Sequence, residues 1–284
     1  IVLRVLDSSK VQVSLDSLGF TPEVLRTWRD LIRLPSGVIL VTGPTGSGKT
    51  TTLYGSLHEI NIPEANISTL EDPVEYKLPR VQQVQVNPRT NMTFAAGLRA
   101  LLRQDPDIIM VGEIRDLETA DMAIRAAHTG HLVFSTLHTN EAASTVVRLT
   151  HMGVEPFMIA GSVRAILAQR LLRRLCRSCR VEEKTDPALL RRLVGAEEDA
   201  GPFYSARGCD HCRQSGYFGR VGVYELMVIS EPLRQKMIDN VGLSEIRAAA
   251  QAEGMITLRD DAIAKARKGV TSLDEVSRVA MVSS

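Results

Sequence analysis

Short apolar runs alternate with helical patterns through the first half of the chain. Four of the runs have the length of buried strands: Val38–Val41, Ile67–Leu70, Ile108–Val111 and Leu132–Leu137. Three nearby segments carry the spacing of helices: Leu25–Leu34, Phe94–Leu102 and Leu117–His128. A glycine-rich turn at 43–50 opens a further helix. This alternation predicts an α/β fold, in which helices cover both faces of a mostly parallel sheet.

The pattern changes beyond about residue 170. Three segments of different character follow: a basic one with cysteines at 173–180, a charged one at 184–200 and a glycine-rich one at 208–222. We expect the glycine-rich segment to be irregular. From residue 231 onward the pattern is helical again, with turns at Gly242, Gly254 and Gly269. At the other end, Ile1–Leu6 resembles the end of a strand, so we interpret 1–16 as a remnant strand and linker of a preceding domain.

The composition is that of an ordinary globular protein, with 44% apolar and 24% charged residues. A net charge of only +1 argues against a duplex-DNA binder, and 4% aromatic residues argue against a base-stacking platform. We therefore expect no nucleic-acid partner. The sequence contains no apolar run long enough to span a bilayer and no signal-peptide organisation. All four cysteines lie in two CxxC pairs, which indicates a reducing compartment and a metal site more than disulfides.

One segment matches the phosphate-binding pattern G-x-x-x-x-G-K-[ST] at every constrained position: Gly43-Pro44-Thr45-Gly46-Ser47-Gly48-Lys49-Thr50. It lies between a predicted strand and a predicted helix, where backbone N–H groups and the helix dipole can surround a phosphate. Lys49 would reach the β- and γ-phosphates, and the Thr50 hydroxyl would bind Mg²⁺. The loop alone fits ATPases, GTPases and small-molecule kinases. The guanine-reading Asn-Lys-x-Asp that GTPases usually carry is absent, and no acceptor site for a kinase is recognisable.

Two acidic segments follow predicted strands. Glu113 comes directly after the run Ile108–Val111, at the strand end where parallel sheets bind their ligands, so we predict that it orients the attacking water. Gly112 stands just before it, and metal binding is therefore expected to depend more on Thr50 and water. Glu71 is favoured for the same edge of the sheet because it comes first after its strand. For Asp72 and Glu75, a solvated turn is an equally good interpretation.

His138 and several arginines complete the predicted site. His138 closes the strand that follows the catalytic one, where it could contact the γ-phosphate, although a single histidine is more often structural. Arg99, Arg103 and Arg115 lie just before and after the catalytic strand. Surface arginines usually face solvent, but phosphoryl transfer needs cations at the γ-phosphate, and a neighbouring subunit often supplies one.

The cysteines form two chelating pairs, Cys176-x₂-Cys179 and Cys209-x₂-Cys212. Four thiolates in two such pairs are typical of a tetrahedral zinc site. A redox function is the alternative, but the thioredoxin-like context that it requires is missing. Four closed ligands leave no open position on the metal, so we predict a structural zinc.

The motifs together resemble the bacterial type II secretion and type IV pilus assembly ATPases over essentially the whole chain. The resemblance is carried by four motifs: Gly43 to Tyr54 (similar to the family's Walker A, with Thr51 included), Leu70 to Glu75 (Asp box), Gly112 to Asp116 (Walker B) and Thr129 to Asn140 (His box). Leu98 to Asp107 and Gly219 to Leu226 also match. The resemblance implies that Arg4, Arg99, Arg103, Arg115 and Arg220 occupy positions where the family carries arginines around the nucleotide.

The resemblance also implies partners. Family members act as cytoplasmic homo-hexamers, attached peripherally to the inner membrane through a secretion platform and its cytoplasmic adaptor domain. An N-terminal domain precedes their core, and from the residual Ile1–Leu6 strand we expect that most of it is absent here. The tetracysteine module favours the secretion and pilus-extension branches, because retraction motors generally lack it.

These observations predict four parts: a remnant strand and linker (1–16), a RecA-like P-loop ATPase core (17–170), a tetracysteine zinc module (171–225) and a helical C-terminal region (226–284). The expected function is Mg²⁺-dependent ATP hydrolysis that powers type II protein secretion. A type IV pilus extension ATPase is the alternative. Two other classes are a nucleotide-gated scaffold with little turnover and a DNA-processing motor. Near-neutral charge and the four cysteines weigh against the DNA-processing motor.

Overall fold

The computed structural model describes residues 14–183, 187–194 and 202–280. A seven-stranded sheet, ordered β3-β2-β4-β5-β1-β6-β9, forms the centre, and β7 and β8 form a small second sheet. Strands β1 to β6 of the large sheet are parallel, whereas β9 runs antiparallel to β6. The strands are β1 (Gly37–Thr42), β2 (Ile67–Glu71), β3 (Val81–Gln85), β4 (Ile108–Val111), β5 (Leu132–Leu137), β6 (Val163–Leu175), β7 (Arg180–Glu183), β8 (Phe203–Ala206) and β9 (Tyr217–Val228).

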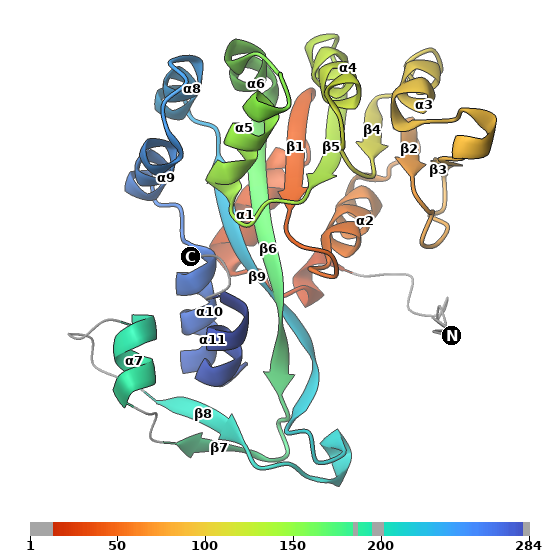
Figure 1. Ribbon diagram of the computed structural model, residues 1–284. Coiled ribbons are helices and arrows are strands. Elements are labelled where there is room, and N and C mark those ends of the chain that lie inside the picture. The colour runs from red at the N-terminus through yellow and green to blue at the C-terminus, as the bar shows by residue number, and fades with distance from the viewer. Residues whose placement is uncertain (1–13, 184–186, 195–201, 281–284) are drawn as a thin grey trace.

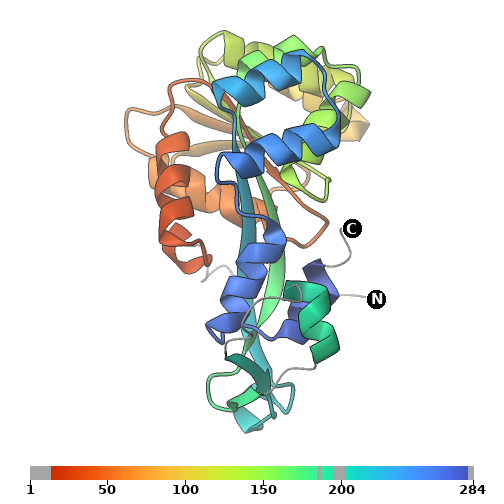
Figure 2. The same cartoon turned by 90° about the vertical axis from the view of Figure 1, so that its left-hand side faces the viewer.

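Helices cover both faces of the large sheet (Figures 1 and 2). The helices of the described residues are α1 (Pro22–Leu31), α2 (Lys49–Ile60), α3 (Phe94–Leu101), α4 (Leu117–His128), α5 (Ala142–His151), α6 (Pro156–Ser162), α7 (Pro187–Val194), α8 (Glu231–Ile238), α9 (Leu243–Ala252), α10 (Leu258–Arg267) and α11 (Leu273–Ala280). Of these, α7 packs against α11 and not on the large sheet. Short 3-10 turns are η2 (Leu15–Ser17), η3 (Pro88–Thr90) and η4 (Asp210–Cys212). Within the described ranges, no helix has both the length and the apolar character needed to cross a membrane.

Alternating side chains of the strands fill two separate cores. In β1, Val38 and Leu40 pack with helices α3 to α6, whereas Ile39 and Val41 pack with α1 and α2. A strand that is buried on both faces must be apolar at every position, which explains why β1 appears in the sequence as a continuous apolar run. The predicted α/β class with a mostly parallel sheet is confirmed.

Sequence patterns located most core elements but missed some. Helix α1 begins at Pro22 rather than Leu25, because the Thr21 side chain accepts a hydrogen bond from Val24 N and caps the helix one turn earlier. Strand β3 was not predicted, since its side chains are half-buried or exposed and it carries no apolar run. Helices α5 and α6, which lie on the sheet face shared with α4, were also not predicted.

Strands β6 and β9 form a long two-stranded ribbon that continues past the rest of the sheet (Figure 1). The expectation of irregular structure over 208–222 is wrong for its last part, because β9 begins at Tyr217 and pairs with β6 from Leu175 back to Ala165. Gly222 has a packing reason: a Cβ there would overlap the ring of Tyr224. The predicted domain boundaries at 170 and 225 fall inside β6 and β9, so no linker separates the predicted parts at these two positions. The division into domains stays a prediction.

Candidate nucleotide site and cysteine cluster

The glycine-rich loop between β1 and α2 has the backbone that a phosphate cradle needs. Gly46 and Gly48 have φ of 78° and 91°, in the left-handed region that side chains rarely adopt. A Cβ added at Gly46 would meet nothing within 4 Å, so the loop tip is open. Gly48 is the N-cap of α2 and has no side chain to occupy the first turn. The loop thus presents its backbone N–H groups and the start of a helix to one small volume.

Lys49 lies at the start of α2 and folds back over the loop. Its Nζ donates to the carbonyl oxygens of Gly43 at 2.9 Å and of Pro44 at 3.2 Å. Burial lowers the pKa of Lys49; the charge of Glu113 opposes this shift, and that of Arg170 adds to it. The ammonium group therefore lies within electrostatic range of both an acid and a second cation.

Gln169, in the middle of β6, holds the loop through its side-chain amide. Its amide nitrogen donates to the Ser47 carbonyl at 2.7 Å, and its amide oxygen accepts from the Thr52 hydroxyl at 2.9 Å. A Cβ at Gly43 would lie 2.5 Å from the Gln169 carbonyl oxygen, so only glycine fits there. Sequence reasoning missed this residue, although it follows an apolar run as Glu113 does.

Glu113 follows β4 and lies in an ion-pair cluster. Arg115 contacts one carboxylate oxygen, and His138 Nε2 lies 3.4 Å from the other. Arg115 also reaches Asp72 at 3.5 Å, and its hydrogen bond to Glu113 raises the pKa of Arg115. The structure thus brings together three of the predicted site residues, Glu113, Arg115 and His138. They meet because β4 and β5 are neighbouring parallel strands whose carboxyl ends share one edge.

Glu71 is not part of this cluster. Its buried carboxylate accepts hydrogen bonds from Tyr54, from Thr69 at 2.6 Å and from Gln83 at 3.1 Å. Burial, and then the bond to Glu71, raise the pKa of Tyr54. From this segment, the acid in contact with Arg115 is Asp72, because successive residues at a strand end point in opposite directions. Glu71, favoured for the site because it comes first after its strand, thus lies outside the ion-pair cluster, which Asp72 joins instead, and its role at the site stays a prediction.

The loop after β5 joins the site to several elements. Thr139 exchanges hydrogen bonds with Thr42 at the end of β1, with 2.6 Å between the hydroxyl oxygens. Asn140 accepts from Arg170 of β6. Glu141 pairs with Arg247 of α9 at 2.6 Å. One short segment therefore connects the strand before the phosphate loop with the C-terminal helices.

The remaining predicted arginines lie apart from Glu113. Arg99 pairs with Glu118 at 3.0 Å on the surface, and Arg103 is exposed at the end of α3. Arg220 is exposed on β9, opposite Arg173 of β6. Arg4 lies outside the described residues. None of the three described arginines touches an acid of the Glu113 cluster through an ion pair in the described ranges.

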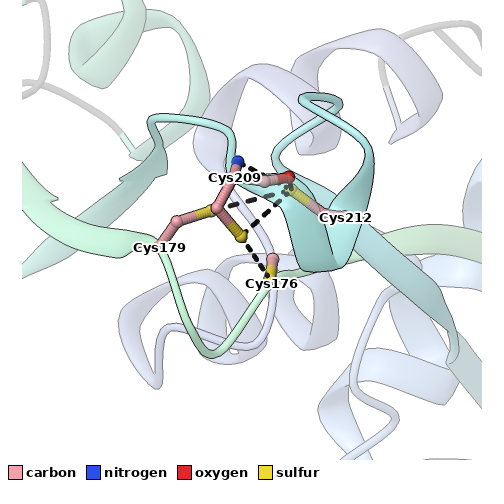
Figure 3. A group of neighbouring side chains, drawn as sticks. All are labelled: Cys176, Cys179, Cys209 and Cys212. Carbon is pink, nitrogen blue, oxygen red and sulfur yellow. Dashed lines mark hydrogen bonds between the residues drawn. The ribbon is translucent and has the colours of Figure 1, made fainter.

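The four cysteines converge at the far end of the β6–β9 ribbon (Figure 3). All four sulfur atoms lie within 4.8 Å of one another. The distances of 3.8 Å for Cys176–Cys209, 3.8 Å for Cys179–Cys212 and 3.7 Å for Cys209–Cys212 are close to the edge of a tetrahedron of thiolates around zinc, about 3.8 Å for Zn–S of about 2.3 Å. The cluster could therefore hold one tetrahedral metal ion.

Local backbone geometry favours the thiolate form of Cys212. The N–H groups of Cys209 and Gly216 each lie 3.2 Å from its sulfur. Burial raises the pKa of the Cys212 thiol, but these donors outweigh it and lower the pKa to about 6. Burial raises the pKa of Cys179 to about 12. A ligand set in which one thiol ionises readily fits a metal that binds thiolates.

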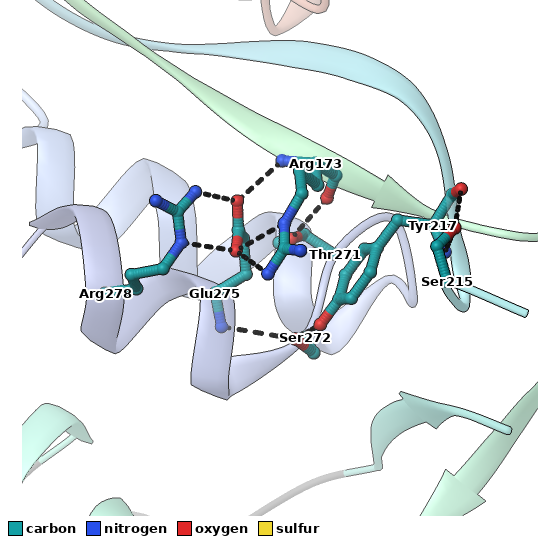
Figure 4. A network of polar contacts seen from close by, with 7 residues as sticks. All are labelled: Arg173, Ser215, Tyr217, Thr271, Ser272, Glu275 and Arg278. Carbon is teal, nitrogen blue, oxygen red and sulfur yellow. Dashed lines mark hydrogen bonds and ion pairs between the residues drawn. The ribbon is translucent and has the colours of Figure 1, made fainter. Parts of the chain in front are cut away.

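A buried acid fastens α11 to the ribbon next to the cysteines (Figure 4). The Glu275 side chain is fully buried and accepts from Arg173 at 2.7 Å and Arg278 at 2.6 Å, and also from the Arg173 backbone. Thr271 donates to the Arg173 carbonyl, and the ring of Tyr217 lies under the Arg173 guanidinium, 4.1 Å away. Burial raises the pKa of Glu275, but the arginine hydrogen bonds outweigh this and lower it to about 2.

Replacing Glu275 with glutamine is expected to lower the free energy of unfolding by about 2 kcal/mol at neutral pH. The folded pKa is depressed, so this stabilisation is present above the ordinary value of 4.5 and is lost as the pH falls toward about 2. Denaturant unfolding from pH 7 to pH 3 measures it. The difference between parent and variant should shrink as the pH falls. Asp274→Asn, an exposed neighbour, is the control, and equal destabilisation by both would contradict the assignment.

Comparison with known proteins identifies the family. The family model for "Type II/IV secretion system protein" matches residues 1–278. Type II secretion system protein HxcR of Pseudomonas aeruginosa is 51% identical over 279 residues, which cover 98% of this chain and 56% of HxcR. Type IV pilus assembly ATPase PilB of the same organism is 52% identical over 282 residues, 98% of this chain and 50% of PilB. Type II secretion system ATPase E of Vibrio cholerae is 48% identical over 279 residues, 98% of this chain and 55% of that protein.

The chain thus spans about half the length of these curated relatives. Among solved structures, the pilus retraction motor PilT with bound ADP has a TM-score of 0.73 at 31% identity, over 97% of this chain and 68% of that one. The ATPase DotB of Legionella pneumophila, at 24% identity and a TM-score of 0.69, shares the fold. The resemblance carried by the sequence motifs is confirmed, and the chain belongs to the type II/IV secretion system protein family.

Proposed function

We propose that this chain is the nucleotide-hydrolysing part of a motor that uses ATP to power type II protein secretion, by driving pseudopilus assembly across the bacterial envelope. The observation that carries the proposal is the position of Glu113 at the end of β4, where Arg115 and His138 hold its carboxylate. The charge of this carboxylate acts on Lys49 of the phosphate loop. An acid fixed beside a phosphate loop can orient and deprotonate an attacking water.

The loop residues would hold the phosphates of ATP. Of the residues from Gly43 to Thr51, Gly43 and Pro44 would shape the turn, because the Gly43 N–H donates to the Leu137 carbonyl and Pro44 has no N–H; the backbone N–H groups that follow would face the phosphates. The Ser47 hydroxyl is buried with no hydrogen-bond partner among the described residues. That orphaned donor fits a phosphate oxygen. Lys49 would exchange the carbonyls of Gly43 and Pro44 for phosphate oxygens. Thr50, exposed on the first turn of α2, would bind Mg²⁺, which neutralises phosphate charge when bound.

The remaining predicted residues take supporting roles in this proposal. Arg99, Arg103 and Arg220 are exposed, so they are available to a nucleotide held by a neighbouring subunit. Glu71 acts through Tyr54, whose helix carries the phosphate loop, and not on the attacking water. Arg4 would belong to the same set of arginines around the nucleotide.

The assembled form would be a cytoplasmic homo-hexamer attached to an inner-membrane secretion platform through its adaptor domain. Relatives named for type II secretion and for type IV pilus assembly match this chain almost equally, at 51% and 52% identity. A pilus extension ATPase is therefore the second candidate. A nucleotide-gated scaffold with little turnover is a different class, and it would tolerate loss of Glu113.

The cysteine cluster would hold one structural zinc. Sulfur spacing close to that of a tetrahedral site and two N–H groups directed at Cys212 support this proposal. With Cys176, Cys179, Cys209 and Cys212 all bound, the metal would keep no open position. Its contribution would be to fix the end of the β6–β9 ribbon.

Replacing Lys49 with alanine is expected to weaken ATP and ADP binding about tenfold or more, because charge-assisted hydrogen bonds to phosphate are lost. Competition against a fluorescent nucleotide in the presence of Mg²⁺ measures this. Lys77→Ala, which removes an exposed lysine, is the matched control and should leave both affinities unchanged. Unchanged binding by the Lys49 variant would contradict the proposed nucleotide site.

A further inference from the structure

Arg170 is a buried cation without an acidic partner. The residue is only 6% exposed and follows Gln169 on β6. Its Nη1 donates to the Gln169 carbonyl at 3.1 Å, and its Nη2 donates to the carbonyl and to Oδ1 of Asn140, both at 3.0 Å. Burial lowers the pKa of Arg170. In the part of the chain that the structure describes, no carboxylate forms an ion pair with it.

Glu225 does not neutralise Arg170 by contact. The charge of Glu225 raises the pKa of Arg170, but less than burial lowers it. The two oxygens of Glu225 accept from the backbone N–H groups of Ala142 at 2.7 Å and Leu258 at 3.3 Å, so they cap α5 and α10. A buried charge without a contacting counter-ion is unfavourable unless something else compensates it.

The position of Arg170 suggests what that counter-ion is. The Gln169 carbonyl that it bonds lies against Gly43, at the start of the phosphate loop. Its charge also lowers the pKa of Lys49, so the two cations share one electrostatic environment. Asn140, its other partner, lies two residues after His138, which contacts Glu113. Arg170 therefore lies between the phosphate loop and the loop that carries His138.

We propose that Arg170 is a further nucleotide-binding residue, which pairs with the terminal phosphate of a bound nucleoside triphosphate. This inference rests on the proposed function, because it requires that loop 43–50 binds the nucleotide. The γ-phosphate of a triphosphate would be the negatively charged partner that the Arg170 guanidinium does not have among the described residues. A diphosphate has no γ-phosphate and would not reach Arg170. Arg170 would then distinguish ATP from ADP, and Asn140 would hold the guanidinium in the diphosphate state.

A purely structural role is the alternative, in which Arg170 only fastens the 138–141 loop to β6. The two roles predict different effects on the affinities for ADP and ATP. A clamp would affect both nucleotides through the shape of the loop, whereas a terminal-phosphate contact affects the triphosphate alone. Asn140→Ala tests the clamp separately, because it removes the side chain that Arg170 holds and keeps the guanidinium.

The experiment measures the affinities of ADP and of a non-hydrolysable ATP analogue, by competition against a fluorescent ADP with Mg²⁺, for Arg170→Gln and Arg170→Lys. The matched control is Arg164→Gln. Arg164 lies on the same strand, donates to a carbonyl (Ser36) and has its pKa lowered by burial, but it lies near the start of β6, six residues before Arg170. We expect Arg170→Gln to weaken the analogue about ten- to a hundredfold, with ADP changed by less than about twofold. The affinity of Arg170→Lys for the analogue should lie between those of the parent and of Arg170→Gln. Arg164→Gln should bind both nucleotides as the parent does.

Two results would overturn the proposal: equal weakening of both nucleotides, or no change in either. A loss of analogue affinity in Asn140→Ala as large as in Arg170→Gln would also overturn it, in favour of the clamp. Thermal unfolding of each variant identifies any that fail to fold, in which case Arg170→Lys provides the measurement. Lys49→Ala distinguishes a failure of the Arg170 proposal from a failure of the proposed function. A parent-like nucleotide affinity in the Lys49 variant would mean that the loop does not bind nucleotide, whereas weakened binding there would leave only the role of Arg170 contradicted.

Discussion

Replacing Glu113 with glutamine is expected to lower the rate of ATP hydrolysis about 100-fold or more while ATP still binds. The amide keeps the size of the side chain but cannot take a proton from water. It also removes the negative charge that Arg115 contacts and that raises the pKa of Lys49. Nucleotide affinity should therefore be kept or increased, since one negative charge near the phosphates is gone.

Phosphate release and nucleotide binding, measured on the assembled protein, test this together. The matched control is Asp121→Asn, which removes an exposed acid paired with Arg125 on α4. Parent-like turnover is expected from the control. If the Glu113 variant hydrolysed ATP at the parent rate, Glu113 would not be the base, and the scaffold alternative would remain open. Loss of binding in this variant would instead assign Glu113 a structural role.

The sequence was sufficient to bring Glu113 and His138 together. Both residues follow apolar runs, and in a parallel sheet the carboxyl ends of neighbouring strands share one edge. What it could not provide was the direction of each side chain. Glu71 and Asp72 are adjacent, and only the pairing of β2 between β3 and β4 directs Glu71 toward Tyr54 and Asp72 toward Arg115. An alternation at a strand end depends on register, which no local pattern determines.

The residues that sequence reasoning missed lie on β6. Gln169 and Arg170 follow the apolar residues of that strand, as Glu113 follows those of β4. A polar residue that follows an apolar run usually marks a strand end, but β6 continues to Leu175 with further apolar and basic residues. The sequence pattern therefore changes within the strand, and no strand end is recognisable at Gln169. Pairing with β9 is what extends β6 past the sheet, and that partner lies far along the chain in a glycine-rich segment. Long-range pairing thus overrode the local preference.

The cysteine cluster, in contrast, could be predicted from the sequence. Two CxxC pairs indicate one four-ligand metal site, whatever the structure of the residues between them. The ribbon that carries the pairs was not predicted. Cys176 directly follows β6, whereas Cys209 and Cys212 lie between β8 and β9, and the pairing of β6 with β9 and of β7 with β8 brings the two segments together. Antiparallel pairing therefore brings Cys176 and Cys209 to 3.8 Å. Chemistry that depends only on side-chain type and spacing can be predicted, whereas chemistry that depends on strand register cannot.

Removing zinc is expected to unfold the end of the β6–β9 ribbon while the phosphate loop stays folded. Metal analysis of purified protein should find about one zinc per chain, and binding of a structural zinc provides about 10–16 kcal/mol of apparent free energy, which the local fold then lacks. Cys209→Ser should do the same as chelation. Faster amide exchange is expected over β7, β8 and residues 207–217, and nucleotide affinity should be affected last, because Lys49 and Glu113 have no contact with the cluster among the interactions that the structure describes.

The control for this prediction is His211→Ala. His211 lies between Cys209 and Cys212 and is a common metal-ligand type, but its ring packs against that of Phe218 in a tilted arrangement, and it is not part of the four-sulfur group. This variant should keep its zinc and its exchange pattern, whereas Cys209→Ser loses both. A preparation without zinc and with four freely titratable thiols would contradict the metal site. Loss of zinc in the His211 variant would mean that the ligand set is not the four cysteines. Rapid exchange that spreads at once to α2 would mean that the metal stabilises the whole fold, not only the end of the ribbon.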